Sequence, residues 1–159
     1  QKVSVISGTV AENIRMGNKS ATDDEVIDAL KTAQAYEFIE KLPDKINAPV
    51  LQGGKNFSGG QKQRLTIARA IAAKPEILIL DDSTSALDMT TDLNLRRAIA
   101  DLPENPVVIM ISQRATSLKN ADKILVLEDG KAVGFGTHDY LCENCEVYSE
   151  IVEIQKAGE

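Results

Sequence analysis

The most informative stretch of this sequence runs Phe57-Ser58-Gly59-Gly60-Gln61-Lys62-Gln63-Arg64-Leu65. The serine and two glycines precede a strong helical pattern, which we expect to span Gln61 to Lys74 and to stop at Pro75. Glycines let a ligand approach the backbone closely, and the start of a helix presents free N–H groups at the positive end of its dipole. The stretch therefore predicts an anion site, with phosphate as the usual anion. Taken alone, it is also consistent with a simple helix cap.

Two apolar runs further along the chain each end in polar residues. Ile77 to Leu80 and Val107 to Ile111 are continuously apolar, as expected for strands buried on both faces of a parallel sheet. Asp81 and Asp82 follow the first run, and Ser112-Gln113-Arg114 follows the second. Ligands of parallel α/β sheets bind beyond the carboxyl ends of the strands, and carboxylates there suit Mg²⁺ beside nucleotide phosphates. Both runs together predict one site at one edge of a sheet.

The rest of the chain alternates helical and strand patterns, which indicates an α/β fold. Thr9 is predicted to cap a short helix with Glu12 as its capping-box partner, and Thr22 or Asp23 to cap the next helix. Residues 44–57 lack periodicity, and we expect an irregular loop there. The further elements that we expect are helices over Tyr36 to Leu42 and Thr90 to Leu102, a short helix through Leu118, a hairpin of Lys123 to Leu127 and Lys131 to Gly134, and helices near His138 to Glu143 and Val147 to Gln155.

The composition limits the classes of function. The 159 residues are 43% hydrophobic and 26% charged, with a net charge of −6, as in ordinary globular proteins. No basic cluster stands out, so we expect no nucleic-acid partner. No apolar run approaches the ~20 residues of a membrane span, and no signal peptide is visible. Because Gln1 opens the chain without an initiator Met, we expect a fragment boundary there, whereas the polar residues 155–159 look like a natural end.

Cys142 and Cys145 form a lone C-x-x-C pair. Such a pair is compatible with half a zinc site or with a redox pair. A second ligand pair is absent from the sequence and His138 is its only histidine, so we favour two reduced cysteines of a cytosolic protein.

Several motifs in this order resemble the ATP-binding domain of ABC transporters, and of multidrug exporters in particular. Phe57 to Gln61 looks like the signature LSGGQ, Ile77 to Asp82 resembles Walker B, and Ser85-Ala86-Leu87-Asp88 matches the D-loop. Gln1 takes the place of the Q-loop glutamine, since Ser7 to Ile14 reads like the exporter segment that follows it, and Gln113 occupies the switch position. The resemblance covers essentially the whole chain. It implies part of a P-loop NTPase-like ABC ATPase domain, with a helical signature subdomain over about 9–74 and a parallel-sheet core with a C-terminal hairpin and helices over about 75–159.

The resemblance also implies ATP and Mg²⁺ as cofactors and a second ABC domain as partner. These domains pair head to tail around two ATP molecules, so Ser58, Gly59, Gly60 and Gln61 would meet the γ-phosphate of ATP bound to the partner, unless Ser58 and Gln61 only cap the helix. Asp81 would hold Mg²⁺, Gln1 would reach Mg²⁺ or the attacking water, and Asp88 would couple the two sites. A transmembrane domain upstream in the same chain would place the full-length protein at the cytoplasmic face of the cell membrane, whereas this chain alone would be soluble.

Three features depart from the family pattern. No G-x-x-x-x-G-K-[ST] phosphate loop occurs, so we expect the chain alone to bind ATP weakly and to be inactive. Asp82 stands where glutamate is usual, and a catalytic group misplaced by about 1 Å can cost ~100-fold in rate. Gln113 replaces the switch histidine and cannot become cationic.

Asp82 and Gln113 together resemble the degenerate half of a heterodimeric multidrug exporter. The ATP site on this chain would then hydrolyse slowly, while its signature would complete the competent site on the partner. Three alternatives stay open: a homodimeric exporter of lipid, peptide or drug, a non-transport ABC ATPase, and a purely structural interaction module. The segment Ser7 to Ile14 favours an exporter.

Overall fold

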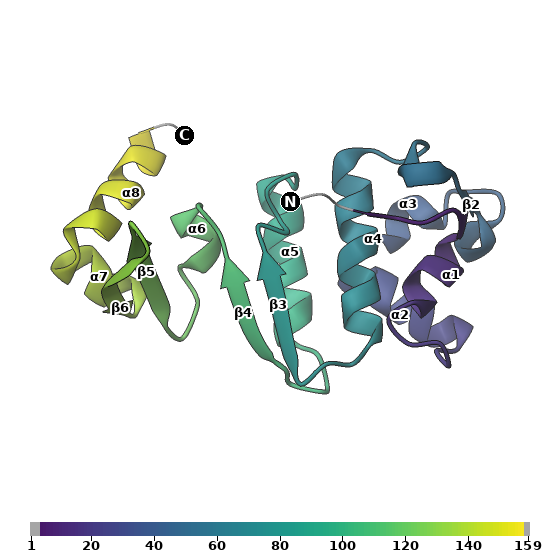
Figure 1. The fold of residues 1–159 in the computed structure, drawn as a ribbon, viewed down its shortest axis with the longest axis horizontal. Coiled ribbons are helices and arrows are strands. Elements are labelled where there is room, and N and C mark those ends of the chain that lie inside the picture. The colour runs from purple at the N-terminus through teal and green to yellow at the C-terminus, as the bar shows by residue number, and fades with distance from the viewer. Residues whose placement is uncertain (1–3, 158–159) are drawn as a thin grey trace. The chain divides into compact units, whose positions relative to one another are not determined.

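The computed structural model describes residues 4–157, and the chain divides into two compact units, Gln1–Ile111 and Ser112–Glu159. The elements of the first unit are β1 (Gly8–Thr9), α1 (Val10–Arg15), α2 (Asp23–Thr32), α3 (Tyr36–Ile39), η1 (Lys45–Asn47), β2 (Pro49–Val50), η2 (Gln52–Gly54), α4 (Gly59–Ala72), β3 (Ile77–Asp81), α5 (Met89–Ala100) and β4 (Val107–Ile111) (Figure 1). Those of the second are α6 (Ala115–Leu118), β5 (Ile124–Glu128), β6 (Lys131–Gly136), α7 (His138–Asn144) and α8 (Glu146–Ala157). The subdomain boundary expected near residue 74 stays a prediction.

Helices α1 and α2 of the first unit start as the sequence predicts, whereas α4 starts at Gly59, two residues before the predicted Gln61, and ends at Ala72. The Thr9 and Thr22 side chains accept from the N–H groups of Glu12 and Glu25, and both glutamates bond back to the cap backbone, which completes two capping boxes. Helix α4 runs through the core of the unit. Its apolar residues Leu65, Ile67, Ala68, Ile71 and Ala72 are all buried, as expected.

The segment 44–57 contains more structure than the irregular loop that we expected. It holds η1, β2 and η2, and β2 pairs antiparallel with β1, so that Gly8 lies opposite Val50 and Thr9 opposite Pro49. The prediction failed here because a two-residue strand carries no alternating pattern, and its partner lies about forty positions away in the sequence. Helix α3 likewise ends at Ile39 and does not reach Leu42.

Asn13 ties the start of the described chain to helix α4. Its side chain is buried; the amide Nδ2 donates to the carbonyl oxygens of Ile6 and Thr9, and Oδ1 accepts from the Ile6 N–H. Arg69 of α4 donates to both the carbonyl oxygen and Oδ1 of Asn13, at 2.9 Å each. The segment before α1 is therefore held on α4 by hydrogen bonds, in addition to the apolar packing of the buried Val5.

Replacing Asn13 by leucine should destabilise the domain by about 2 kcal/mol, because the isosteric side chain removes part-buried hydrogen bonds to the backbone of Ile6 and Thr9 and to Arg69. Urea unfolding of the whole ATP-binding domain measures this loss. Asn47 is exposed, so Asn47→Leu is the matched control and should change stability by less than about 0.5 kcal/mol. Equal effects of both substitutions would contradict the structural role given to Asn13.

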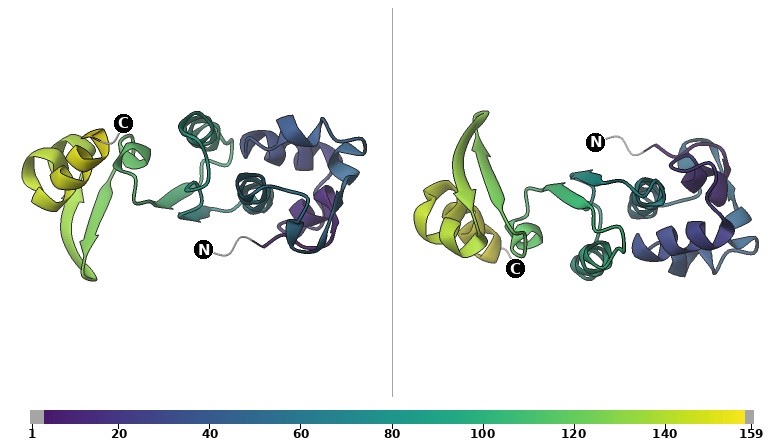
Figure 2. Two further views of the ribbon diagram at one scale, coloured as in Figure 1. Left: turned by 90° about the horizontal axis from the view of Figure 1, so that it is seen from above. Right: turned by 90° about the horizontal axis from the view of Figure 1, so that it is seen from below.

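Strands β3 and β4 form the parallel pair that the sequence predicts, in a register that sets Ile77 opposite Val107 and Asp81 opposite Ile111. The expectation that both faces are buried is wrong for the described residues. Leu78 and Leu80 are buried, but Ile77 and Ile79 are more than half exposed, and β4 is exposed along most of its length. The end-on views show α5 on one face of the pair and no element of this unit on the other (Figure 2).

The second unit contains the predicted hairpin. Strands β5 and β6 pair antiparallel around the Asp129-Gly130 turn, and α7 and α8 pack with them around a small core that includes Leu141, Tyr148 and Val152. Cys142 and Cys145 are free thiols, and Cys145 is buried in this core. Within residues 4–157, no group of three or more His, Cys, Asp or Glu side chains is arranged to hold a metal ion.

Candidate functional site

The N-terminus of α4 is built by a capping box. Ser58 is the N-cap; its Oγ accepts from the Gln61 N–H at 3.3 Å, while the Gln61 Oε1 accepts from the Ser58 N–H at 2.8 Å. The Ser58 hydroxyl thus accepts from the helix and keeps its own proton available for donation to an anion. The helix begins with Gly59 and Gly60, whose backbone N–H groups have no protein acceptor among the described residues. These free N–H groups carry the partial positive charge of the helix N-terminus and can donate to an anion.

Gly60 packs directly on the segment that follows β3. A Cβ atom built on Gly60 would lie 2.9 Å from the carbonyl oxygen of Ala86, whereas one on Gly59 would meet nothing within 4 Å. The first of the two glycines leaves room for a ligand, and the second is required by the neighbouring backbone. The predicted anion site therefore lies against the segment 82–88.

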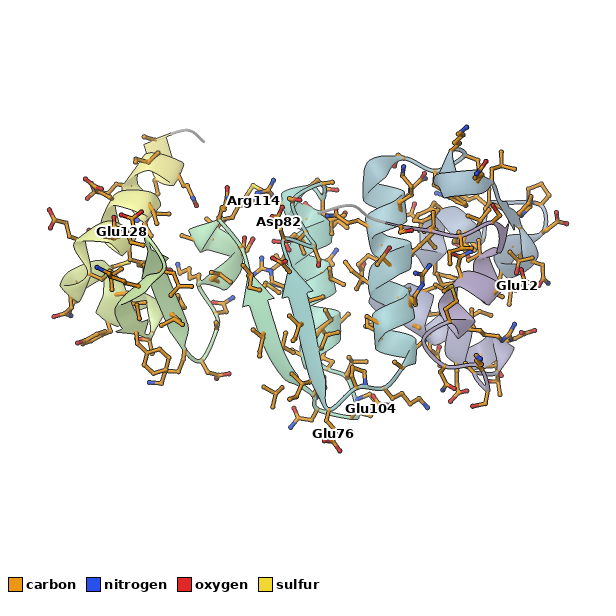
Figure 3. All side chains as sticks on the ribbon, viewed as in Figure 1. Glu12, Glu76, Asp82, Glu104, Arg114 and Glu128 are labelled. Atoms are coloured by element: carbon orange, nitrogen blue, oxygen red, sulfur yellow. The ribbon has the colours of Figure 1, made fainter. Side chains whose placement is uncertain are left out.

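Asp81 and Asp82 lie at the carboxyl end of β3, as predicted. Both are exposed, and Asp82 appears at the opposite end of β3 from Glu76 (Figure 3). The Asp82 N–H donates to the Ile111 carbonyl at 3.0 Å, which extends the parallel ladder by one bond. Carboxylate oxygens with the phosphates of a nucleotide form the usual ligand set of Mg²⁺, which keeps several waters and needs only one or two protein carboxylates. These residues therefore fit a metal that is bound together with a nucleotide.

Asp88 is fixed as the N-cap of α5. Its Oδ1 accepts from the Thr91 N–H at 3.0 Å and its Oδ2 from the Thr91 hydroxyl at 2.7 Å. The Thr91 backbone N–H first, and then the Thr91 hydroxyl, hold the pKa of Asp88 below its usual value, so this carboxylate stays ionised at neutral pH. Asp88 therefore caps helix α5, and the role in coupling two ATP sites stays a prediction.

The substitution Thr91→Val should raise the pKa of Asp88 part of the way back, since the hydroxyl donor is lost and the backbone N–H remains. A carboxyl whose folded pKa is lowered stabilises the fold above its unfolded pKa, and this contribution is lost as the pH falls through the folded pKa. The variant should therefore be less stable than the parent at neutral pH and equal to it in strong acid. An NMR titration of the Asp88 carboxyl checks the shift, with Thr90→Val as the control that leaves it unchanged.

Two residues of α4 that sequence reasoning did not select also belong to this site. Gln63 is buried and bonds to the backbone of Asp82 and Ala86. Arg64 lies on the Phe38 ring at 4.9 Å and donates to the Gln34 carbonyl. Burial lowers the pKa of Arg64, while the charge of Asp88 acts in the opposite direction. A signal for Gln63 was present, because it stands four residues before Ile67 and eight before Ile71 and so shares their buried face.

The structure brings Ser58, Gly59, Gly60 and Gln61 together with the segment that carries Asp82 and Asp88. Gln113 belongs to the second unit, where its side chain is exposed and its carbonyl accepts from Gln155 at 2.7 Å. Gln1 lies outside the described residues. Over residues 4–157, no helix combines the length and the apolar character that a membrane crossing requires.

Comparison with known proteins places these features in one family. The family model described as ABC transporter matches residues 1–85. The chain is 46% identical over 155 residues to the ABC transporter ATP-binding protein YfiB of Bacillus subtilis and 41% identical over 155 residues to ABC transporter B family member 4 of Dictyostelium discoideum. A solved structure of a bacterial Atm1-family ABC exporter with ATP bound matches with a TM-score of 0.91 and 33% identity, over 97% of this chain and 27% of that one.

The matches cover nearly all of this chain and a small part of its relatives. They span 98% of the chain in both sequence comparisons, but only 27% of YfiB and 20% of the Dictyostelium protein. The α/β architecture predicted from the sequence is confirmed by the match to the exporter structure. The chain belongs to the ABC transporter family and forms part of its ATP-binding domain.

Proposed function

We propose that this chain is the signature-bearing part of the ATPase domain of an ABC exporter, in which ATP binding and hydrolysis with Mg²⁺ drive transport. The observation that carries the proposal is the packing of the N-terminus of α4 on the carboxylate-bearing segment after β3, where a Cβ atom built on Gly60 would lie 2.9 Å from the Ala86 carbonyl oxygen. The helix end offers donors for a phosphate and the strand end offers carboxylates for a metal, and in a head-to-tail pair each serves a different one of the two ATP molecules. Phosphoryl transfer needs both kinds of group, since its catalysis rests on positioning and charge stabilisation.

The proposed partners are a second ATP-binding domain and a transmembrane domain. In a head-to-tail pair, the hydroxyl of Ser58 and the amides of Gly59 and Gly60 donate to the γ-phosphate of ATP held by the partner, and Gln61 supports them through its capping bond with Ser58. A relative in Rickettsia felis, 40% identical over 98% of this chain, is named as an export ATP-binding/permease protein, which supports a permease partner. The cytoplasmic face of a membrane is the corresponding location.

At the chain's own ATP site, we assign roles first to the two aspartates at the carboxyl end of β3. Asp81 binds Mg²⁺, and Asp82 orients the attacking water from a side chain one methylene shorter than the usual glutamate. Gln1 reaches the metal or the water, and Gln113 hydrogen-bonds the phosphate without adding a positive charge. A short base and a neutral switch residue both slow hydrolysis, so we infer the slow half of a heterodimeric exporter, with multidrug export as the inferred transport class.

The test of this proposal is Mg²⁺-dependent single-turnover ATP hydrolysis at this chain's own site, in the full-length protein paired with its partner in lipid vesicles. Asp81→Asn removes the charge that binds the metal, and we expect a roughly 10-fold higher Mg²⁺ requirement. Glu76, at the opposite end of β3, supplies the control, and Glu76→Gln should leave the Mg²⁺ dependence unchanged. The proposal would be contradicted if the wild-type protein with its partner did not hydrolyse ATP. It would also be contradicted if Asp81→Asn left the Mg²⁺ requirement unchanged.

A further inference from the structure

Gln63 is a polar side chain in the buried face of α4, and its amide bridges to the segment after β3. Only 7% of the residue is exposed. Its Nε2 donates to the Asp82 carbonyl oxygen at 3.2 Å and lies 3.5 Å from the Ser85 hydroxyl, while its Oε1 accepts from the Ala86 N–H at 3.2 Å. One side chain of the helix thus holds both ends of the turn 82–86.

The backbone that Gln63 holds has an uncommon conformation. Asp82 has φ = 47°, in the left-handed region that residues other than glycine seldom adopt. Such a conformation persists only where the surroundings fix it, and it is frequent at functional sites. The Asp82 carbonyl accepts from the Ser85 hydroxyl at 3.0 Å, within the same turn, whereas Gln63 provides an anchor from outside the turn.

A second contact joins the same two elements. Gly60, one helical turn before Gln63, approaches the Ala86 carbonyl so closely that a Cβ atom would lie 2.9 Å away. Helix α4 therefore contacts Ala86 at two points: Gly60 faces its carbonyl oxygen, and Gln63 accepts from its N–H. Because both contacts join α4 to Ala86, we expect a shift of the helix end to move the turn with it.

We propose that Gln63 is a positioning residue for Asp82, which sets the direction of the Asp82 carboxylate and couples it to the N-terminus of α4. This inference rests on the proposed function, in which Asp82 orients the attacking water of the chain's own site. The α4 N-terminus serves the ATP of the partner in that arrangement. Gln63 then connects the two nucleotide sites of the pair through a single side chain.

The first test compares Gln63→Leu with the wild type in the full-length protein and its partner. Leucine has a similar volume and removes both hydrogen bonds, so the single-turnover rate at this chain's site should fall about 10-fold, with the half-saturating ATP concentration changed less than about 2-fold. Hydrogen exchange of the Ala86 amide should become about 10-fold faster, because its acceptor is lost. Ile71→Val, a buried change at the far end of α4, is the control: it lowers stability and leaves both readouts unchanged.

The second test is a pH profile of Gln63→Glu. A carboxylate at this position accepts from the Ala86 N–H but cannot donate to the Asp82 carbonyl, whereas a protonated carboxyl can do both. The ratio of the variant rate to the wild-type rate should therefore rise as the pH falls. A residue that only fills space would give a flat ratio.

The outcomes separate the inference from the function on which it rests. If the wild type hydrolyses Mg-ATP and Gln63→Leu matches Ile71→Val in rate and in Ala86 exchange, the positioning role is overturned and the function stands. If the wild type does not hydrolyse Mg-ATP, the proposed function fails, and Ala86 exchange still decides the coupling. Exchange that is unchanged in Gln63→Leu overturns the coupling, and faster exchange supports it.

Discussion

Replacing Gly60 by alanine should lower ATP hydrolysis by the paired full-length protein about 100-fold, because it displaces the anion-binding helix end by a sizeable fraction of an ångström. The new Cβ atom would lie 2.9 Å from the Ala86 carbonyl oxygen, which belongs to backbone and cannot rotate away. Either α4 or the segment 82–88 must move. Helix α4 and the segment 82–88 both carry groups whose relative positions the proposed mechanism requires. The loss should therefore appear in the maximal rate of ATP turnover.

The neighbouring glycine supplies a matched stability control for this result. Gly59→Ala adds the same methyl group one position earlier, where a Cβ atom meets nothing within 4 Å. The two substitutions gain similar helix propensity, so the difference between their unfolding free energies isolates the contact with Ala86. We expect Gly60→Ala to be less stable than Gly59→Ala by about 1–3 kcal/mol. Equal stability, or wild-type turnover in Gly60→Ala, would show that this close approach has no consequence.

Asp82→Glu should raise single-turnover hydrolysis at this chain's own site by up to about 100-fold, since the added methylene brings the carboxylate about 1 Å closer to the attacking water. The structure also identifies an opposing effect. Asp82 has φ = 47°, and aspartate tolerates this left-handed conformation better than glutamate does. We therefore expect the faster variant to lose roughly 0.5 kcal/mol of stability.

A second aspartate with the same backbone conformation is the control for this substitution. Asp129, in the hairpin turn of the second unit, has φ = 48°. Asp129→Glu should carry a similar strain cost and leave hydrolysis unchanged. A rate that does not rise in Asp82→Glu would mean that the length of this side chain is not what limits the site.

Local signals in the sequence account for much of the fold and for the core of the site. Capping residues such as Thr9 act within one helical turn, so the start of α1 could be predicted closely, and that of α4 to within two residues. The parallel pairing of β3 and β4 followed from two apolar runs joined by a helix. That pairing also predicted polar residues at one edge of the sheet, where Asp81 and Asp82 lie.

Features that depend on distant contacts could not be predicted in this way. The exposure of Ile77 and Ile79 depends on which layers cover a strand, and an apolar run does not carry that information. The pairing of β1 with β2 joins segments without periodicity. The bridging role of Gln63 depends on the contact between α4 and the turn 82–86, which the sequence does not specify. The position of Gln63 on an apolar helical face indicated only that its side chain is buried.

The central claim is that this chain builds a slow ATP site of its own and completes a fast one on its partner. The most direct measurement is single-turnover ATP hydrolysis by the full-length protein in lipid vesicles, alone and together with its partner half. We expect slow hydrolysis by the protein alone and fast hydrolysis by the pair. Equally fast hydrolysis by the protein alone would contradict it and would indicate a homodimeric exporter in which Asp82 and Gln113 suffice.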